Sequence, residues 1–170
     1  QALQKIYSAE TAADFHLEDY DYIVDAIDSL QDKAQLILHA CRTKARFFSS
    51  MGAALKLDPT RIAVAEFWKV RGCPLGAALR RRFKKQGVKP ARKFKCVYSE
   101  ELLPNLGETH VCDTATCMCS KASEKSGDPA LFDHDWNSSK AQINGSLAHI
   151  TAIFGFTLAG LILQDSLRPH

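Results

Sequence analysis

The fold of this chain is decided by the stretch Tyr20-Asp-Tyr-Ile-Val-Asp-Ala-Ile-Asp-Ser29, in which a short apolar run ends in an acid. The near-continuous apolar content of residues 22–27 predicts a buried parallel strand. Residues 30–44 follow with helical periodicity, and Ser29 stands where a helix cap is expected. Ligands of α/β proteins bind outside the carboxyl ends of strands, so the sequence points first to Asp28.

The carboxylate of Asp28 has two interpretations that its spacing leaves open. It can hold Mg²⁺ beside a nucleotide phosphate, because Mg²⁺ prefers a few carboxylate oxygens together with phosphate and water. It can also simply cap the following helix, which spacing alone slightly favours. Asp25 lies inside the predicted strand, so we expect it to make a structural hydrogen bond.

The remaining periodicities predict an α/β fold in which short parallel strands are extended by antiparallel strands and covered by packed helices. Residues 46–50 form the next strand, so the first two strands and their helix make a βαβ unit. Residues 62–68 alternate in polarity and should pair antiparallel with a strand around Phe94 to Tyr98. Between them a helix begins at Pro74 and is ended by Gly87, and a last helix covers roughly 145–166.

Composition is that of a soluble globular domain. The 170 residues are 46% hydrophobic and 24% charged, enough for one real core. Six cysteines without a signal peptide predict a reducing, cytoplasmic setting. Residues 141–164 carry no acid, lysine or arginine, but only 150–163 are convincingly apolar, which is short of the ~20 residues of a membrane span. We therefore expect a helix buried in the core and no membrane partner. The sequence has no G-x-G-x-x-G, Walker or nucleophile-elbow motif.

Basic residues are concentrated in one part of the chain. Residues 80–95 contain nine lysines and arginines and no acid. Such a stretch favours an anionic partner, with RNA as the first candidate, although a solvated helix face is the commoner explanation. The helical members predicted to contact nucleic acid are Arg80, Arg81, Arg82, Lys84 and Lys85.

The cysteines fall into two groups. Cys112, Cys117 and Cys119 lie within eight residues of one another, with His110 and His134 nearby. They are candidate reactive thiols, or zinc ligands, although the spacing C-x4-C-x-C is not that of a zinc ribbon. The other three, at positions 41, 73 and 96, are expected to pack in the core.

Several blocks of sequence together resemble one family. They are Tyr22 to Ser29 with Lys33 following, Ser49-Ser-Met-Gly-Ala53, Leu57-Asp-Pro-Thr-Arg-Ile62, Pro74-Leu75 with its basic helix, Cys96-Val-Tyr-Ser99 and Ile153-Phe-Gly-Phe156. The chain is similar to the ubiquitin-activating-type (ThiF/MoeB-like) adenylating superfamily, and within it to the bacterial tRNA threonylcarbamoyladenosine dehydratases. The resemblance runs from about residue 19 to residue 163 and is weakest over 101–144.

The resemblance implies a concrete chemistry. Members bind ATP and Mg²⁺ and adenylate a carboxylate, here that of the threonylcarbamoyl group on a tRNA adenosine. Loss of AMP then gives the cyclic, dehydrated nucleoside. Asp28 matches the family aspartate that binds Mg²⁺, which makes it the catalytic and metal-binding candidate. Lys33 falls at a recurring family position and is a second cofactor-binding candidate. The basic helix would face tRNA, and a homodimer is expected.

The chain also departs from the family pattern. The family's Gly-rich ATP loop lies in the first half of its domain, so residues 1–170 are expected to be a partial adenylating domain with a long crossover segment at 100–144. Such a chain alone would bind ATP poorly and be inactive. Two alternatives stay open. One is a ubiquitin-like-modifier or sulfur-carrier adenylating enzyme, with a carrier or sulfur-transfer protein as its partner. The other is an RNA- or protein-binding module without catalysis.

Overall fold

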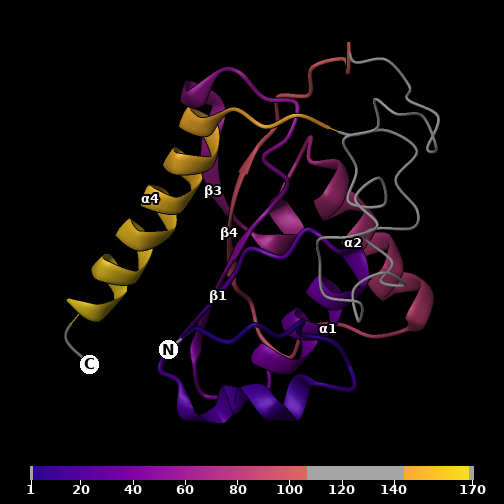
Figure 1. Cartoon of the computed structure of the whole chain (residues 1–170), viewed down its shortest axis with the longest axis vertical. Coiled ribbons are helices and arrows are strands. Elements are labelled where there is room, and N and C mark those ends of the chain that lie inside the picture. The colour runs from indigo at the N-terminus through magenta and orange to yellow at the C-terminus, as the bar shows by residue number, and fades with distance from the viewer. Residues whose placement is uncertain (1, 107–143, 169–170) are drawn as a thin grey trace. The chain divides into compact units, whose positions relative to one another are not determined.

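The computed structural model describes residues 2–106 and 144–168. The chain divides into two units, residues 1–103 with 146–170, and residues 104–145. Almost all of the second unit lies outside the described residues. The first unit carries every helix and strand described below, and its backbone is shown in Figure 1.

A four-stranded sheet in the order β1-β2-β4-β3 forms the centre of the first unit. β1 (Tyr22–Asp25), β2 (Arg46–Ser50) and β4 (Lys95–Ser99) are parallel, and β3 (Ile62–Glu66) runs antiparallel to β4. This confirms the predicted α/β class and its antiparallel extension. We call the edge where the three parallel strands end the carboxyl edge, and the edge where they begin the amino edge.

Helices cover both faces of the sheet. α1 (Leu30–Ala40) and α2 (Pro74–Gln86) lie on one face, and α4 (Ala148–Ser166) lies on the other (Figure 1). Four short 3-10 helices complete the described part: η1 (Ala12–Phe15), η2 (Leu17–Asp19), η3 (Pro59–Arg61) and η4 (Phe67–Lys69). α2 ends as predicted, because Gly87 adopts the left-handed conformation (φ +66°) in which the final carbonyls are capped.

Alternation along the strands divides the core between the two faces. Phe47 and Cys96 face the α1 and α2 side, where Phe67 stacks on Phe94 with ring centroids 5.0 Å apart. Phe48 and Val97 point the other way and pack under α4. The three described cysteines, Cys41, Cys73 and Cys96, are buried and unpaired, as predicted.

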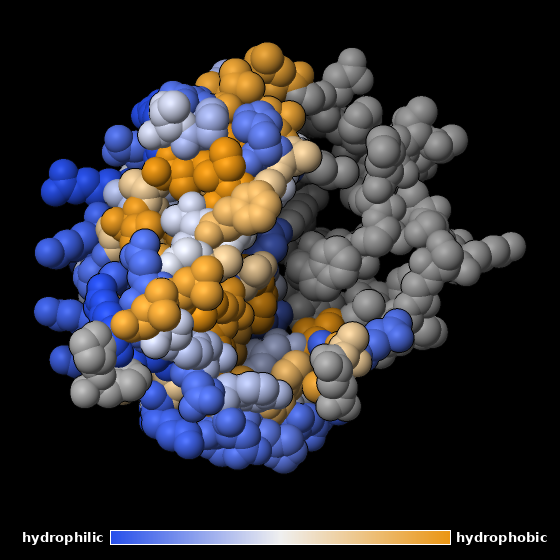
Figure 2. Space-filling view, turned by 90° about the vertical axis from the view of Figure 1, so that its left-hand side faces the viewer, coloured by the Kyte–Doolittle hydropathy of each residue, from blue (hydrophilic) through white to orange (hydrophobic). Residues whose placement is uncertain are grey.

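The last helix, α4, packs against the sheet, but it is not buried in the core as expected. Its buried stripe consists of Ile150, Phe154, Leu158 and Leu161, which recur at helical spacing and pack on the sheet. The opposite side stays exposed, with Phe156 76% and Leu163 62% accessible. Figure 2 shows apolar side chains across the face of the molecule that carries this helix. By length and composition α4 could cross a membrane, while its buried stripe is that of a helix packed on a sheet.

Candidate functional site

A fully buried ion pair lies just behind the carboxyl edge. The Oδ2 atom of Asp25, the last residue of β1, is 2.7 Å from Nζ of Lys33 on α1, and both side chains are completely inaccessible. The same carboxylate accepts a hydrogen bond from Ser49 Oγ of β2 at 2.6 Å. It also accepts the backbone N–H of Ile27 at 2.9 Å through its other oxygen. The structural hydrogen bonding expected of Asp25 is confirmed, and its charge is neutralised within the protein.

The ammonium of Lys33 fixes the backbone next to Asp28. Besides pairing with Asp25, Nζ donates to the carbonyl oxygen of Ile27 at 3.0 Å. Both the N–H and the C=O of Ile27 are therefore held by one buried pair. Removing one partner of such a pair is costly because it leaves an unpaired charge in the interior. The sequence carried a signal for this burial, since Lys33 and Ile37 lie four residues apart on the inward side of the helix.

Asp28 lies in the loop that leaves the carboxyl edge, and it is exposed. The observed helix cap is Ser29, whose Oγ accepts the N–H of Asp32 at 3.4 Å. The capping interpretation thus applies to Ser29, one residue after Asp28. Within the described residues no group of three or more His, Cys, Asp and Glu side chains could hold a metal ion. A single carboxylate can therefore bind Mg²⁺ only if phosphate oxygens and water molecules supply most of the other ligands.

A second buried polar cluster lies at the carboxyl edge, just after β4. Oε2 of Glu101 accepts the backbone N–H groups of Leu57 at 2.8 Å and Asp58 at 2.9 Å. These N–H groups hold the pKa of the Glu101 carboxyl below its ordinary value. Nζ of Lys56 donates to the carbonyl oxygen of Glu101, and burial lowers the pKa of this lysine. The cluster fixes the start of the Leu57 to Ile62 block, and sequence reasoning missed it because its partners are more than 40 residues apart.

The basic residues of α2 are not all available to a partner. Arg80 is half-buried, donates to the carbonyl oxygen of Phe67 at 3.1 Å and lies over the ring of that residue. Arg82 is also half-buried, whereas Arg81, Lys84 and Lys85 are exposed. These residues lie on a helix that packs on the face opposite α4 (Figure 1). The candidate reactive thiols Cys112, Cys117 and Cys119 lie outside the described residues, as do His110 and His134.

Comparison with known proteins identifies one group of relatives. No family model matches the chain. The tRNA threonylcarbamoyladenosine dehydratase of Escherichia coli strain K12 is 38% identical over 160 residues, covering 91% of this chain and 55% of that protein. The enzyme of the same name from Haemophilus influenzae is 30% identical over 167 residues, covering 95% of this chain and 56% of that protein. The chain therefore spans about half the length of these relatives.

A solved structure supports the same relationship. The crystal structure of the E. coli tRNA N6-threonylcarbamoyladenosine dehydratase in complex with AMP matches with a TM-score of 0.65 and 25% sequence identity. The match covers 96% of this chain and 55% of that one. The α/β fold of the described residues, a mixed four-stranded sheet with packed helices, is thus similar to that of the E. coli enzyme, as the resemblance implied.

Proposed function

Because the chain is a homologue of the tRNA threonylcarbamoyladenosine dehydratases over more than nine-tenths of its length, we propose that it is the carboxyl-terminal part of such an enzyme. The complete protein would use ATP to adenylate the carboxylate of threonylcarbamoyladenosine in tRNA. Loss of AMP would then close the ring and complete the dehydration. The observation that carries this proposal is an exposed Asp28 at the carboxyl edge, within the matched region, on a loop fixed from behind by a buried ion pair.

Asp28 is the residue to which we assign the metal. It would contribute one carboxylate ligand to Mg²⁺, whose other ligands would be phosphate oxygens and water. Mg²⁺ would supply neutralisation of the triphosphate charge. We assign Lys33 a positioning role in place of direct cofactor contact, because its ammonium is engaged by Asp25 and Ile27. Because Lys33 holds the backbone of Ile27, the neighbouring Asp28 would need little rearrangement when the metal binds.

The ATP-binding loop is proposed to lie in the half of the relatives that this chain does not match. A single partial adenylating domain would bind ATP weakly, so we expect the 170 residues alone to be inactive. The segment 100–144 would then be the crossover that precedes α4. The cysteines within it stay candidate thiols without an assigned role.

Two further features of the complete protein belong to this proposal. tRNA would be contacted by the exposed basic residues of α2, Arg81, Lys84 and Lys85. The half-buried Arg80 and Arg82 would add positive charge to the same helix. A homodimer would find an apolar surface on the outer side of α4, around Phe156 and Leu163. As a tRNA-modifying enzyme the protein would act in the cytoplasm, with no membrane partner.

The proposal is tested with the full-length protein that contains this chain. Incubated with ATP and tRNA bearing threonylcarbamoyladenosine, it should convert the nucleoside to its cyclic form, which loses the mass of one water. The product is measured by mass spectrometry of digested tRNA. If AMP formation instead depends on a small carrier protein and tRNA is unchanged, the chain belongs to a sulfur-carrier or modifier-adenylating enzyme. If ATP is not consumed with either substrate, a binding module without catalysis is indicated.

A further inference from the structure

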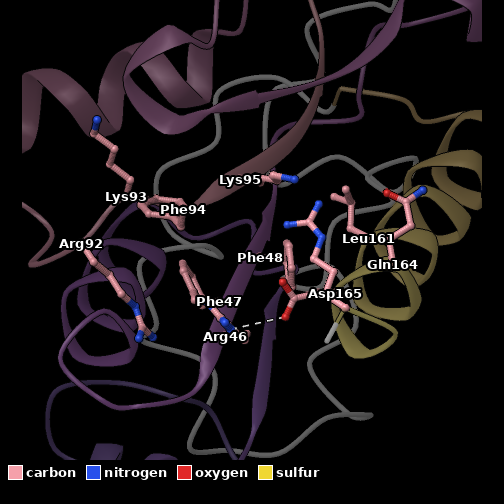
Figure 3. Close-up of a pocket in the computed structure, with 11 residues that line it drawn as sticks. Arg46, Phe47, Phe48, Arg92, Lys93, Phe94, Lys95, Leu161, Gln164 and Asp165 are labelled. Carbon is pink, nitrogen blue, oxygen red and sulfur yellow. Dashed lines mark ion pairs between the residues drawn. The ribbon is translucent and has the colours of Figure 1, made fainter. Parts of the chain in front are cut away.

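A pocket of about 230 Å³ lies at the amino edge, at the opposite end of the sheet from Asp28. It is formed by the first residues of β2, the residues that lead into β4 and the last turns of α4 (Figure 3). None of the residues that line it belongs to the site proposed above. The pocket thus needs an explanation of its own.

The lining of this pocket is strongly cationic. It contains five basic side chains and one acid, namely Arg46, Arg92, Lys93, Lys95, Arg168 and Asp165. The acid is already engaged, since Asp165 Oδ2 accepts the hydroxyl of Tyr22 at 3.1 Å and lies 3.4 Å from Nε of Arg46. An excess of positive charge therefore remains around the opening.

Two of the five cations, Arg92 and Arg46, are held by partners within the protein. The other three form no ion pair with an acid of the described residues. Arg92 donates to the carbonyl oxygens of Ala40, at 3.0 Å, and Ala45, so its guanidinium joins the end of α1 to the start of β2. Arg46 is the partner of Asp165. Lys93, Lys95 and Arg168 are exposed, and no carboxylate among residues 2–106 and 144–168 forms an ion pair with them.

The wall of the pocket beneath α4 is apolar. Phe48 is buried and packs under α4, while Phe47 and Phe94, which also line the pocket, belong to the core on the α1 and α2 side. Leu161 closes the wall from α4. Cations around a low-dielectric wall concentrate the electric field in the opening, which raises the local concentration of anions. Figure 3 shows the Lys95 side chain extending towards Leu161, while that of Lys93 points away from it.

We propose that this pocket binds a phosphate group. Its volume is below the roughly 300–1,000 Å³ of sites that enclose a whole drug-sized ligand, so it suits one phosphate better than a complete nucleotide. A phosphate offers several acceptor oxygens, and the lysines and arginines at the opening can bind them through charge-assisted hydrogen bonds. The phosphate could belong to the backbone of RNA or to a small phosphate compound. The proposal is independent of any role of Asp28.

The test uses the full 170-residue chain and two probes. Amide shifts of residues lining the pocket are followed by NMR while inorganic phosphate is added, with chloride at equal ionic strength as reference. Binding of a fluorescein-labelled single-stranded RNA is measured by anisotropy between about 50 mM and about 200 mM salt. The variant is Lys93→Gln/Lys95→Gln/Arg168→Gln, and Lys93→Arg/Lys95→Arg keeps the charge. Arg71→Gln removes an exposed cation that is not part of the pocket lining.

A phosphate-specific shift of the pocket amides that the triple variant loses supports a small phosphate compound as the ligand. An RNA affinity lowered at least about fivefold in the triple variant, with a salt slope reduced by about 0.7 or more, supports an RNA backbone phosphate. In both cases Lys93→Arg/Lys95→Arg should stay within about twofold of the wild type. The proposal is overturned if neither probe distinguishes the triple variant from the wild type, or if Arg71→Gln weakens binding equally.

Discussion

The two edges of the sheet use charge in opposite ways. At the carboxyl edge Asp25, Lys33 and Glu101 are buried, and each is satisfied by partners inside the protein. At the amino edge Lys93 and Lys95 are exposed at the opening of a pocket that buried aromatic residues also line. The first arrangement fixes backbone, and the second attracts a ligand from solution. Substitutions should therefore change stability at one edge and binding at the other.

The largest effect on stability is expected from Lys33→Met. It leaves the Asp25 carboxylate charged and without its cation in the interior, which should lower the free energy of unfolding by about 3–5 kcal/mol. Urea denaturation followed by circular dichroism measures this loss. Asp25→Asn/Lys33→Met removes both charges while keeping an acceptor for Ser49, and should lose less than the single variant. A single variant within 1 kcal/mol of the wild type would contradict the buried pair.

A smaller loss is expected from Ser49→Ala. This variant removes one hydrogen bond to a buried charged carboxylate and should cost about 2 kcal/mol in the same urea experiment. Ser50→Ala is the matched control, because the Ser50 hydroxyl donates to the adjacent Met51 carbonyl and, among the described residues, to no charged group. Equal losses of stability at both serines would show that the hydrogen bond to Asp25 contributes no more than that of Ser50.

Acid should weaken the second cluster of the carboxyl edge. The pKa of Glu101 is lowered in the folded state, so its stabilising contribution is fully present above the unfolded-state pKa. That contribution is lost as the pH falls through the folded-state pKa, below about pH 5. Glu101→Gln should flatten the acid side of the stability profile, measured by urea unfolding across this range. Glu100→Gln, at an exposed neighbour, serves as control, and identical profiles for all three proteins would contradict the assignment.

The smallest effect on stability is expected at the amino edge. Lys93→Gln/Lys95→Gln should leave the free energy of unfolding within about 0.5 kcal/mol of the wild type, since these side chains are exposed. Thermal unfolding at low salt provides the measurement. Arg92→Gln, which removes donors to two backbone carbonyls, should cost clearly more. A large loss from the lysine variant would mean that these charges have a structural role.

Local patterns explain which elements were predictable. β2 and α2 have the predicted bounds because the signals that set them are local. A short apolar run marks β2, while Pro74 begins α2 and Gly87 ends it. β1 stops at Asp25 instead of continuing to Ile27, because the Asp25 carboxylate accepts the Ile27 N–H and turns the backbone. α1 ends at Ala40, short of the predicted residue 44.

Tertiary contacts explain what was missed. The exposed side of α4 is as apolar as its buried side, so periodicity could not show which part is covered. The burial of Lys33 depends on Asp25 in a neighbouring element, and that of Glu101 depends on N–H groups more than 40 residues away. In the candidate site, the position of Asp28 at a strand end and the structural hydrogen bonding of Asp25 followed from sequence.

The central claim, that Asp28 holds Mg²⁺ for ATP, is tested most directly by comparing two exposed aspartates at opposite ends of β1. In the full-length protein, Asp28→Asn and Asp21→Asn are assayed for ATP-dependent cyclisation of threonylcarbamoyladenosine in tRNA across a range of Mg²⁺ concentrations. The account predicts that Asp28→Asn lowers kcat/KM at least about 100-fold and shifts the Mg²⁺ requirement upward. Asp21→Asn should resemble the wild type. Equal activity and equal Mg²⁺ dependence of the two variants would contradict the account.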